Sequence, residues 1–290
     1  MGGTRSAMPE QPLTLAGIGD EAGAALTDQL AALSTLDWTA IELRSVGGVA
    51  LADLDERTFA GVADAVAGLE VVCVDSRIGN WARTVTDPFG DDLAEFDVLA
   101  RRCATLGCRY LRIMSYPNAG LGERDWRDRV VERVRVLAGR AERAGIVLLH
   151  ENCSGWAGSH AERVLDLLDA VASPALALLF DTGNGIAHGY PALDLLREVV
   201  AHVAHVHVKD ATGGGEHTVY TLPGDGDARV ADCLGLLFDH GYRGALSLEP
   251  HLACVPHEGG GVAGDAADRF VAAGRALDGL VAGLFAGQRG

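Results

Sequence analysis

The sequence of 290 residues predicts a single α/β domain with the (β/α)8 TIM-barrel fold. Short apolar runs alternate with amphipathic helical stretches about eight times along the chain. These runs are too uniformly apolar for strands with one face in water, so they indicate parallel strands that are covered on both faces. Eight strand–helix units in a chain of this length favour a closed barrel over an open, doubly wound sheet.

The eight expected strands lie, in order, at residues 13–19, 40–43, 71–75, 110–114, 146–151, 176–181, 203–207 and 245–249. The expected helices follow them at 22–36, 55–68, 90–106, 125–144, 160–171, 192–202, 229–240 and 265–284. The helix boundaries rest on the 3.6-residue periodicity of apolar positions and on terminating glycines such as Gly107 and Gly145. Residues 1–12 lack the pattern of a signal peptide and are expected to form a flexible leader before a barrel domain of 13–290.

Composition narrows the range of partners. The formal net charge of −16 argues against nucleic acid and anionic membranes, because both would repel the chain. No apolar run approaches the length of a membrane span. The six cysteines form no CxxC pair and indicate reduced thiols in a cytoplasmic protein. A metal cation and a neutral or weakly charged small molecule are therefore the expected partners.

Four side chains that can bind a metal recur at the ends of the last four expected strands. They are Glu151, Asp181, His207 and Glu249. In a parallel barrel the carboxyl ends of the strands carry the chemistry, so these groups should converge there. Three carboxylates and one imidazole predict a divalent-metal site. A helix cap is the plainer role for Asp181, whereas a charged Glu249 at the end of a buried strand requires a partner.

Other candidate residues lie near the same strand ends. Lys209 is the only lysine in the sequence and follows His207 by two positions, which places both on one side of the strand. By the same alternation His205 lies one layer deeper in the barrel, as a packing residue or a support for the site rather than a ligand.

The expected substrate contacts are less specific. Arg44 and Arg112 could bind a carbonyl or anionic group, or could only neutralise the carboxylates. Trp156, like Trp81, could stack on a sugar ring or pack at the rim of the barrel. His251 follows Glu249 by two positions and could contact substrate.

These motifs resemble the sugar phosphate isomerase/epimerase family, the xylose isomerase-like TIM barrels that include ketose 3-epimerases and inosose dehydratases. The resemblance runs from about Leu13 to Leu252 and rests on the motifs His150-Glu151-Asn152, Phe180-Asp181-Thr182-Gly183-Asn184, Val206-His207-Val208-Lys209-Asp210, Pro223-Gly224-Asp225-Gly226, Leu248-Glu249-Pro250-His251, Gly19-Asp20-Glu21 and Ile41-Glu42-Leu43-Arg44. Ketose 3-epimerases carry a histidine at the position of Asn184 and an arginine at that of Gly213. The Lys209-Asp210 pair is closer to the inosose dehydratase branch.

The resemblance implies that Glu151, Asp181, His207 and Glu249 hold a divalent cation, with Mn²⁺ expected first and Co²⁺, Mg²⁺ and Zn²⁺ as alternatives. It adds Glu42 and Asn184 to the expected substrate contacts. Members of the family are usually dimers or tetramers, which allows a homo-oligomer here.

The expected reaction is proton abstraction next to a carbonyl of a sugar or polyol through a metal-stabilised enediolate, by a metal-dependent isomerase or epimerase. Glu151 and Glu249 are the expected base and acid, and Lys209 the group that binds a substrate oxygen or protonates a departing hydroxyl. A dehydratase or another lyase, including one that cleaves C-glycosides, is the main alternative. A metal-dependent phosphodiesterase would need more histidines on the early strands, and a silent binding subunit would leave the four ligands unexplained.

Overall fold

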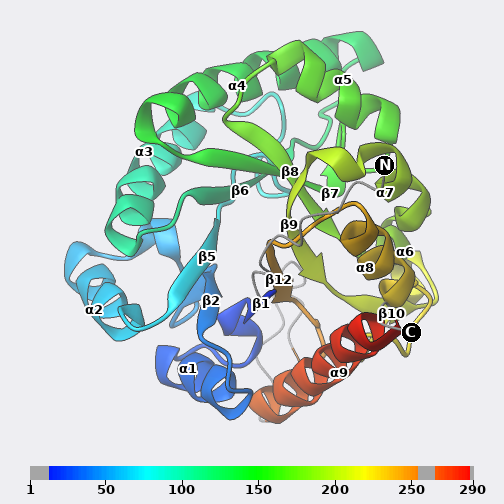
Figure 1. The fold of residues 1–290 in the computed structure, drawn as a ribbon. Helices are drawn as coiled ribbons and strands as arrows, with labels where there is room; N and C mark the ends of the chain where they lie inside the picture. The colour runs from blue at the N-terminus through cyan, green and yellow to red at the C-terminus, as the bar shows by residue number, and fades with distance from the viewer. Residues whose placement is uncertain (1–12, 254–264, 288–290) are drawn as a thin grey trace, which may run out of the picture.

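The computed structural model describes residues 13–253 and 265–287, and the expected leader, residues 1–12, lies outside them. Eight parallel strands form one sheet in the order β1-β12-β9-β8-β7-β6-β5-β2. A parallel bridge between Ile18 and Glu42 joins the first and last of these strands and closes the barrel. Figure 1 looks into this barrel and shows the helices arranged around it. The predicted single-domain (β/α)8 fold is thus confirmed.

The barrel strands are β1 (Thr14–Gly17), β2 (Ala40–Leu43), β5 (Glu70–Asp75), β6 (Tyr110–Ser115), β7 (Val147–Gly155), β8 (Leu176–Asp181), β9 (Val203–Val208) and β12 (Ala245–Leu248). The helices are α1 (Leu26–Thr35), α2 (Glu56–Val66), α3 (Phe89–Leu106), α4 (Glu123–Ala144), α5 (Ala161–Val171), α6 (Asn184–His188), α7 (Ala192–Val199), α8 (Val230–Asp239) and α9 (Ala266–Gly287). All but α6 correspond to an expected helix. The left-handed Gly107 and Gly145 end α3 and α4, as the sequence indicates.

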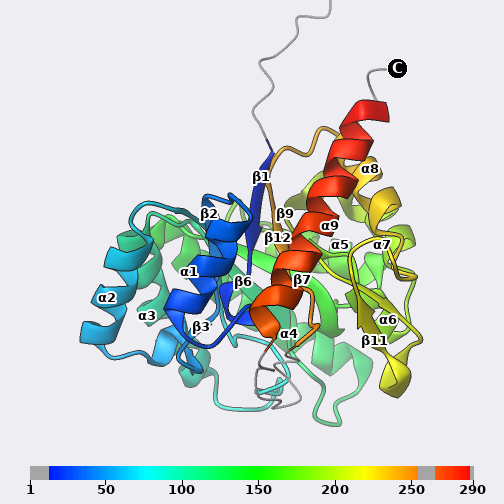
Figure 2. The same cartoon turned by 90° about the horizontal axis from the view of Figure 1, so that it is seen from below.

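The structure adds short elements at the carboxyl ends of the strands. Two hairpins occur there, β3–β4 (Ser45–Val46 and Val49–Ala50) and β10–β11 (Asp210–Thr212 and Val219–Thr221). In the side view of Figure 2, β1 begins at the upper edge and the β10–β11 hairpin lies below, at the opposite end of the barrel. The sheet extends further than expected at β7, which continues past Glu151 to Gly155.

Apolar side chains fill two regions. The larger cluster lies between the barrel and its helices and includes Phe96, Leu99, Leu137 and Leu196. The smaller one lies inside the barrel and consists of Ala16, Ala40, Val72, Cys73, Leu149 and Leu179. Polar groups occupy the rest of the barrel interior, because the buried side chains of Glu42, His205, His207 and Ser247 also come from barrel strands.

Within the described part of the chain, no helix combines the length and the apolar character that a membrane crossing requires. The five cysteines that the structure describes are all reduced and buried. Cys254 lies outside the described residues.

Candidate metal centre

The four side chains expected to bind a metal meet at the carboxyl ends of four consecutive strands. One potential ligand atom from each of Glu151, Asp181, His207 and Glu249 lies within 4.8 Å of the others, and all four residues are buried. His207 Nδ1 lies 3.5 Å from Glu249 Oε2 and 3.9 Å from Glu151 Oε1. The strands β7, β8, β9 and β12 are neighbours in the sheet, which explains this convergence of residues that are far apart in the sequence.

Two ligand atoms in this cluster lack hydrogen bonds, as expected of atoms that face a cation. Among the described residues, neither His207 Nδ1 nor Asp181 Oδ2 has a hydrogen-bond partner, although both are buried. The other oxygen of Asp181, Oδ1, accepts hydrogen bonds from the backbone N–H groups of Gly183 (2.8 Å) and Asn184 (2.7 Å). Asp181 therefore caps the start of α6 with one oxygen and directs the other into the cluster. Buried polar atoms without a hydrogen bond are rare, and Asp181 Oδ2 has only an ion pair with Lys209 Nζ (3.2 Å), so the donor set fits a divalent cation.

Two polar side chains hold the strand ends together. Asn152 Oδ1 accepts a hydrogen bond from Asp181 N (2.6 Å), and Asn152 Nδ2 donates to Asp181 O (2.9 Å). Thr182 Oγ1 likewise accepts from Lys209 N (3.0 Å) and donates to Lys209 O (2.7 Å). The side chains of Asn152 and Thr182 each make a pair of hydrogen bonds to the backbone of the neighbouring strand, like the pairs that backbone groups make within a sheet. The backbones that carry Asp181 and Lys209 are thereby fixed in place.

Glu42 orients the imidazole of His207 from below. Its Oε1 lies 2.9 Å from His207 Nε2, and its Oε2 lies 2.8 Å from His205 Nε2. A proton on His207 Nε2 satisfies the first contact and leaves Nδ1 as the atom that faces the carboxylates. Burial opposes a charged imidazole, but the charges of Glu42 and Glu249 raise the pKa of His207 well above its ordinary value. These charges therefore favour a second proton on His207 when no cation is bound.

One arginine pairs with one carboxylate oxygen of each glutamate in the cluster. Arg44 Nη1 donates to Glu249 Oε1 (2.6 Å) and Arg112 Nη1 donates to Glu151 Oε2 (3.2 Å). In each glutamate the other oxygen is the one near His207 Nδ1. Arg44 is itself held by Asp20 and Glu21, and Arg112 by Asp75.

Buried negative charge exceeds buried positive charge around the centre. The carboxylates are Asp20, Glu21, Glu42, Asp75, Glu151, Asp181 and Glu249, and the permanent cations near them are Arg44, Arg112 and Lys209. Burial raises the pKa of Asp181 to about 6, and the nearby glutamates add to this rise. Burial also raises the pKa of Asp75, to about 7. A divalent cation would offset this excess, because buried like charges are costly without a counter-charge.

Lys209 contacts two of the four potential ligands. Its Nζ lies 2.6 Å from Glu249 Oε2 and 3.2 Å from Asp181 Oδ2. Burial opposes the charge, but Asp181 and Glu249 raise the pKa of Lys209 well above its ordinary value. Burial also opposes ionisation of Glu249, yet Lys209 and His251 hold the pKa of this glutamate well below its ordinary value. The pair is therefore an ammonium beside a carboxylate.

A cavity of about 360 Å³ opens beside the cluster. Its lining includes Glu151, Glu249 and Lys209, together with four of the expected substrate contacts, Arg44, Arg112, Asn184 and His251. Asn184 Nδ2 also donates to Glu151 Oε1 (2.9 Å). Glu21 holds His251 in a left-handed conformation (φ 51°) by accepting from its backbone N–H and contacting its Nδ1, each at 3.0 Å.

Two expected substrate contacts do not line the cavity. Glu42 is fully buried beneath the cluster, because it faces the barrel interior like Ala40 two positions earlier, and its carboxylate contacts two histidines there. Trp156 is also buried, and its Nε1 donates to Glu123 Oε1 (2.8 Å) at the start of α4. Trp81, the other tryptophan considered for stacking, does line the cavity.

Several cavity residues were not expected from the sequence. Tyr220 reaches the cavity on the β10–β11 hairpin, where its ring packs edge-on against His251 at 4.9 Å between centroids. Cys153 and His188 line the wall, with the thiol sulfur 3.3 Å from Nε2. The mixed polar composition of residues 210–221 is typical of a loop, so the sequence carried no signal for this hairpin.

Comparison with known proteins agrees with this architecture. The family model described as xylose isomerase-like TIM barrel matches residues 30–271. An inosose dehydratase of Clostridium perfringens is 28% identical over 144 residues, which cover 44% of this chain and 48% of that protein. The chain thus matches about half the length of this curated relative.

Two solved structures show the same fold. The IolI protein with a bound zinc atom superposes with a TM-score of 0.73 at 15% identity, over 94% of this chain and 98% of that one. A D-allulose 3-epimerase from Methylomonas in complex with D-allulose gives a TM-score of 0.69 at 17% identity, over 93% of this chain and 96% of that one.

Proposed function

Because the chain belongs to the xylose isomerase-like TIM barrel family, we propose that it is a divalent-metal-dependent enzyme that removes a proton next to a carbonyl of a neutral sugar or polyol, as an isomerase or epimerase. The observation that carries the proposal is the convergence of Glu151, Asp181, His207 and Glu249 beside a cavity of about 360 Å³. These four residues would hold the ion. Bound there, it would act as a Lewis acid that stabilises the negative charge developing on a substrate oxygen.

Glu249 is the proposed base. It is ionised, and Arg44 holds one of its oxygens while the other faces the cluster. Glu151 approaches from β7 and is held by Arg112 in the same manner. Two carboxylates on separate strands allow one to take a proton and the other to return it, which is the arrangement that epimerisation requires. Manganese is the proposed ion, because three carboxylates and one imidazole form a predominantly hard ligand set.

The charges around the cavity favour an uncharged substrate. Each arginine and lysine that lines the described cavity wall already contacts carboxylates: Arg44 at Glu249, Arg112 at Glu151 and Lys209 at both Asp181 and Glu249. A phosphate group would have to displace one of these pairs at a large electrostatic cost. Hydroxyl and carbonyl oxygens can instead share the existing donors.

Dehydration is the second candidate. Lys209 is a charged donor at the cavity wall, where it could protonate a departing hydroxyl after the common proton abstraction. The similarity to inosose dehydratase also supports this outcome. Both candidates share the first step, the removal of the proton, and differ only in the second.

The first step can be tested by hydrogen exchange. The protein is stripped of metal, reloaded with Mn²⁺ and incubated in D₂O with neutral ketoses, keto-sugars and inososes. Deuterium should enter at a carbon next to the carbonyl in the wild type and in the control Glu198→Gln, an exposed glutamate on α7, but not in Glu249→Gln. Full exchange in Glu249→Gln would refute the assigned base.

The second step can be tested with Lys209→Met. If the enzyme is a dehydratase, loss of water measured by mass spectrometry should fall by about 10²-fold, the usual weight of a general acid, while deuterium exchange continues. Metal content is measured in parallel, because Lys209 contacts two proposed ligands. Equal losses of exchange and of water elimination at full metal content would contradict the role of Lys209 as an acid.

A further inference from the structure

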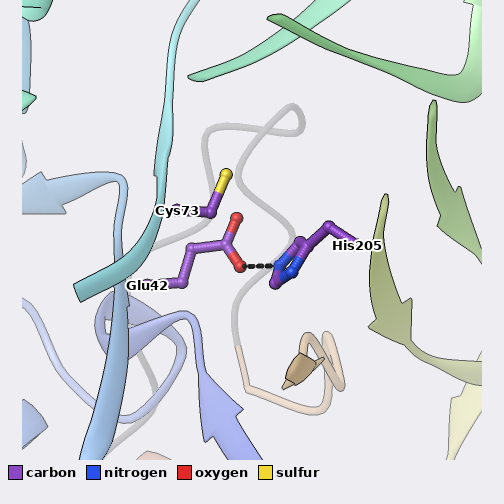
Figure 3. Close-up of side chains that lie close together, drawn as sticks. All are labelled: Glu42, Cys73 and His205. Carbon is purple, nitrogen blue, oxygen red and sulfur yellow. Dashed lines mark hydrogen bonds and ion pairs between the residues drawn. The ribbon is translucent and has the colours of Figure 1, made fainter. Parts of the chain in front are cut away.

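A second group of potential metal ligands lies below the metal centre, inside the barrel. It consists of Glu42 on β2, Cys73 on β5 and His205 on β9, all buried, with one potential ligand atom from each within 4.8 Å of the others. Figure 3 shows the three side chains pointing toward one another, with the carboxylate of Glu42 between the thiol and the imidazole. We call these three residues the lower cluster.

The barrel topology brings this cluster together. Glu42 and Cys73 are register partners on neighbouring strands. His205 lies on the seventh barrel strand, on the wall opposite the third strand that carries Cys73. Glu42 Oε2 lies 2.8 Å from His205 Nε2, and Ser247 Oγ lies 3.1 Å from the same nitrogen. A carboxylate, a thiol, an imidazole and a hydroxyl thus face one another within a single cross-section of the barrel.

We propose that Glu42, Cys73 and His205 form a second cation site that takes a borderline-soft divalent ion such as Zn²⁺ or Co²⁺, with Ser247 Oγ or a water as the fourth ligand. Sulfur, nitrogen and oxygen ligands in a set of four match the tetrahedral preference of Zn²⁺. The upper centre offers no sulfur and therefore differs in the ions it favours. Binding exchanges the proton of the Cys73 thiol for a sulfur–metal bond, and the released proton passes to solvent without any change in oxidation state.

A cavity at the other end of the barrel reaches one residue of the lower cluster. His205 lines a cavity of about 710 Å³ whose other walls are formed by the first residues of the barrel strands, such as Thr14, Glu70 and Tyr110. This cavity lies at the end of the barrel opposite the substrate cavity. In addition, His205 Nδ1 is buried and has no hydrogen-bond partner among the described residues. A water in this cavity could satisfy Nδ1, and an ion that entered the barrel from this end would not cross the upper centre.

The two sites would share Glu42. Its Oε1 contacts His207 Nε2 at 2.9 Å, and its Oε2 belongs to the lower cluster. One carboxylate and one imidazole would then connect the two ions. The lower ion would fix the carboxylate that orients His207, a structural contribution to the upper centre.

The test uses cobalt as a spectroscopic probe of the full chain. The protein is stripped with a chelator and titrated with Co²⁺ while the near-ultraviolet absorption is recorded. A thiolate bound to Co²⁺ gives a charge-transfer band, whereas the oxygen and nitrogen ligands of the upper centre cannot. The band and a second equivalent of bound cobalt are expected in the wild type. Both should disappear in Cys73→Ser and persist in Cys153→Ser, the thiol beside the substrate cavity.

Two further measurements separate a failure of the lower site from a failure of the proposed enzymatic function. In Asp181→Asn the upper centre loses a ligand, so the first equivalent of cobalt should weaken while the thiolate band remains. X-ray absorption of the unmodified, zinc-loaded chain should show a sulfur neighbour, which avoids any folding defect in Cys73→Ser. A single equivalent of cobalt without a thiolate band, or a band that survives Cys73→Ser, would overturn the lower site whether or not the protein is active.

Discussion

Replacing Glu42 by glutamine should weaken metal binding at the upper centre although Glu42 is not one of the four proposed ligands. Its carboxylate accepts from two imidazoles, through Oε1 near His207 and Oε2 near His205. An amide has only one oxygen, so one of the two histidines would face an N–H donor instead. If this is His207, its Nε2 must accept, and its proton moves to Nδ1, the atom that faces the proposed ion.

The expected size follows from this change of tautomer. Losing a group that orients a metal-binding histidine typically costs about 10- to 100-fold in affinity, or about 1.4–2.7 kcal/mol. Mn²⁺ binding measured by calorimetry or electron spin resonance reports on the upper centre, because manganese disfavours the sulfur-containing lower cluster. The matched control is Glu95→Gln, which removes another buried carboxylate, on α3, that pairs with Arg83. Wild-type Mn²⁺ affinity in Glu42→Gln would refute the reasoning.

Three other changes should also have measurable effects. First, Mn²⁺ affinity should rise as the pH increases from about 5 to about 7. The pKa of His207 is raised and that of Asp181 is about 6, so the ion must displace protons from both residues. Calorimetry in buffers of different ionisation enthalpy measures the protons released, and a pH-independent affinity would contradict this prediction. Second, Asp210→Ala should destabilise the fold by about 3 kcal/mol. The Asp210 carboxylate accepts hydrogen bonds from the backbone N–H groups of Ala211, Gly224, Gly226 and Ala228. Urea unfolding measures the lost stability, and Asp225→Ala, at an exposed position, should lose almost none. Third, Gly183→Ala should lower turnover at least about tenfold, because the new Cβ would lie 2.5 Å from Lys209 Cγ and 2.8 Å from Lys209 O, so that both the side chain and the backbone of Lys209 must shift. Gly68→Ala, which meets nothing within 4 Å, is the control, and equal turnover in the two variants would show that the position of Lys209 does not matter.

The barrel could be predicted from the sequence because its strands are covered on both faces and therefore appear as uniform apolar runs. The ends of α3 and α4 could be predicted because Gly107 and Gly145 readily adopt the left-handed conformation that terminates a helix. The convergence of Glu151, Asp181, His207 and Glu249 follows from chain order alone, since consecutive parallel strands are neighbours in a barrel.

The surroundings of several side chains could not be predicted. Strand alternation places Glu42 inside the barrel, on the same side as Ala40, but it does not indicate that the carboxylate lies between two histidines instead of at the cavity. Trp156 follows a strand that runs four residues beyond Glu151, and its indole packs toward α4 instead of the cavity. The five-residue helix α6 is too short to show periodicity, although it carries both Asn184 and His188 to the cavity wall.

The position of Lys209 has a practical consequence for the study of this chain. It supplies the only ε-amine of the protein, and the surrounding carboxylates and the cavity wall leave it 3% exposed. Arginine supplies every other side-chain positive charge apart from histidine, so an amine-selective reagent has a single internal side-chain target. The rate at which a small reagent modifies Lys209, followed by intact mass, would therefore report both access to the cavity and loss of the ammonium proton, and a ligand bound in the cavity should slow that rate.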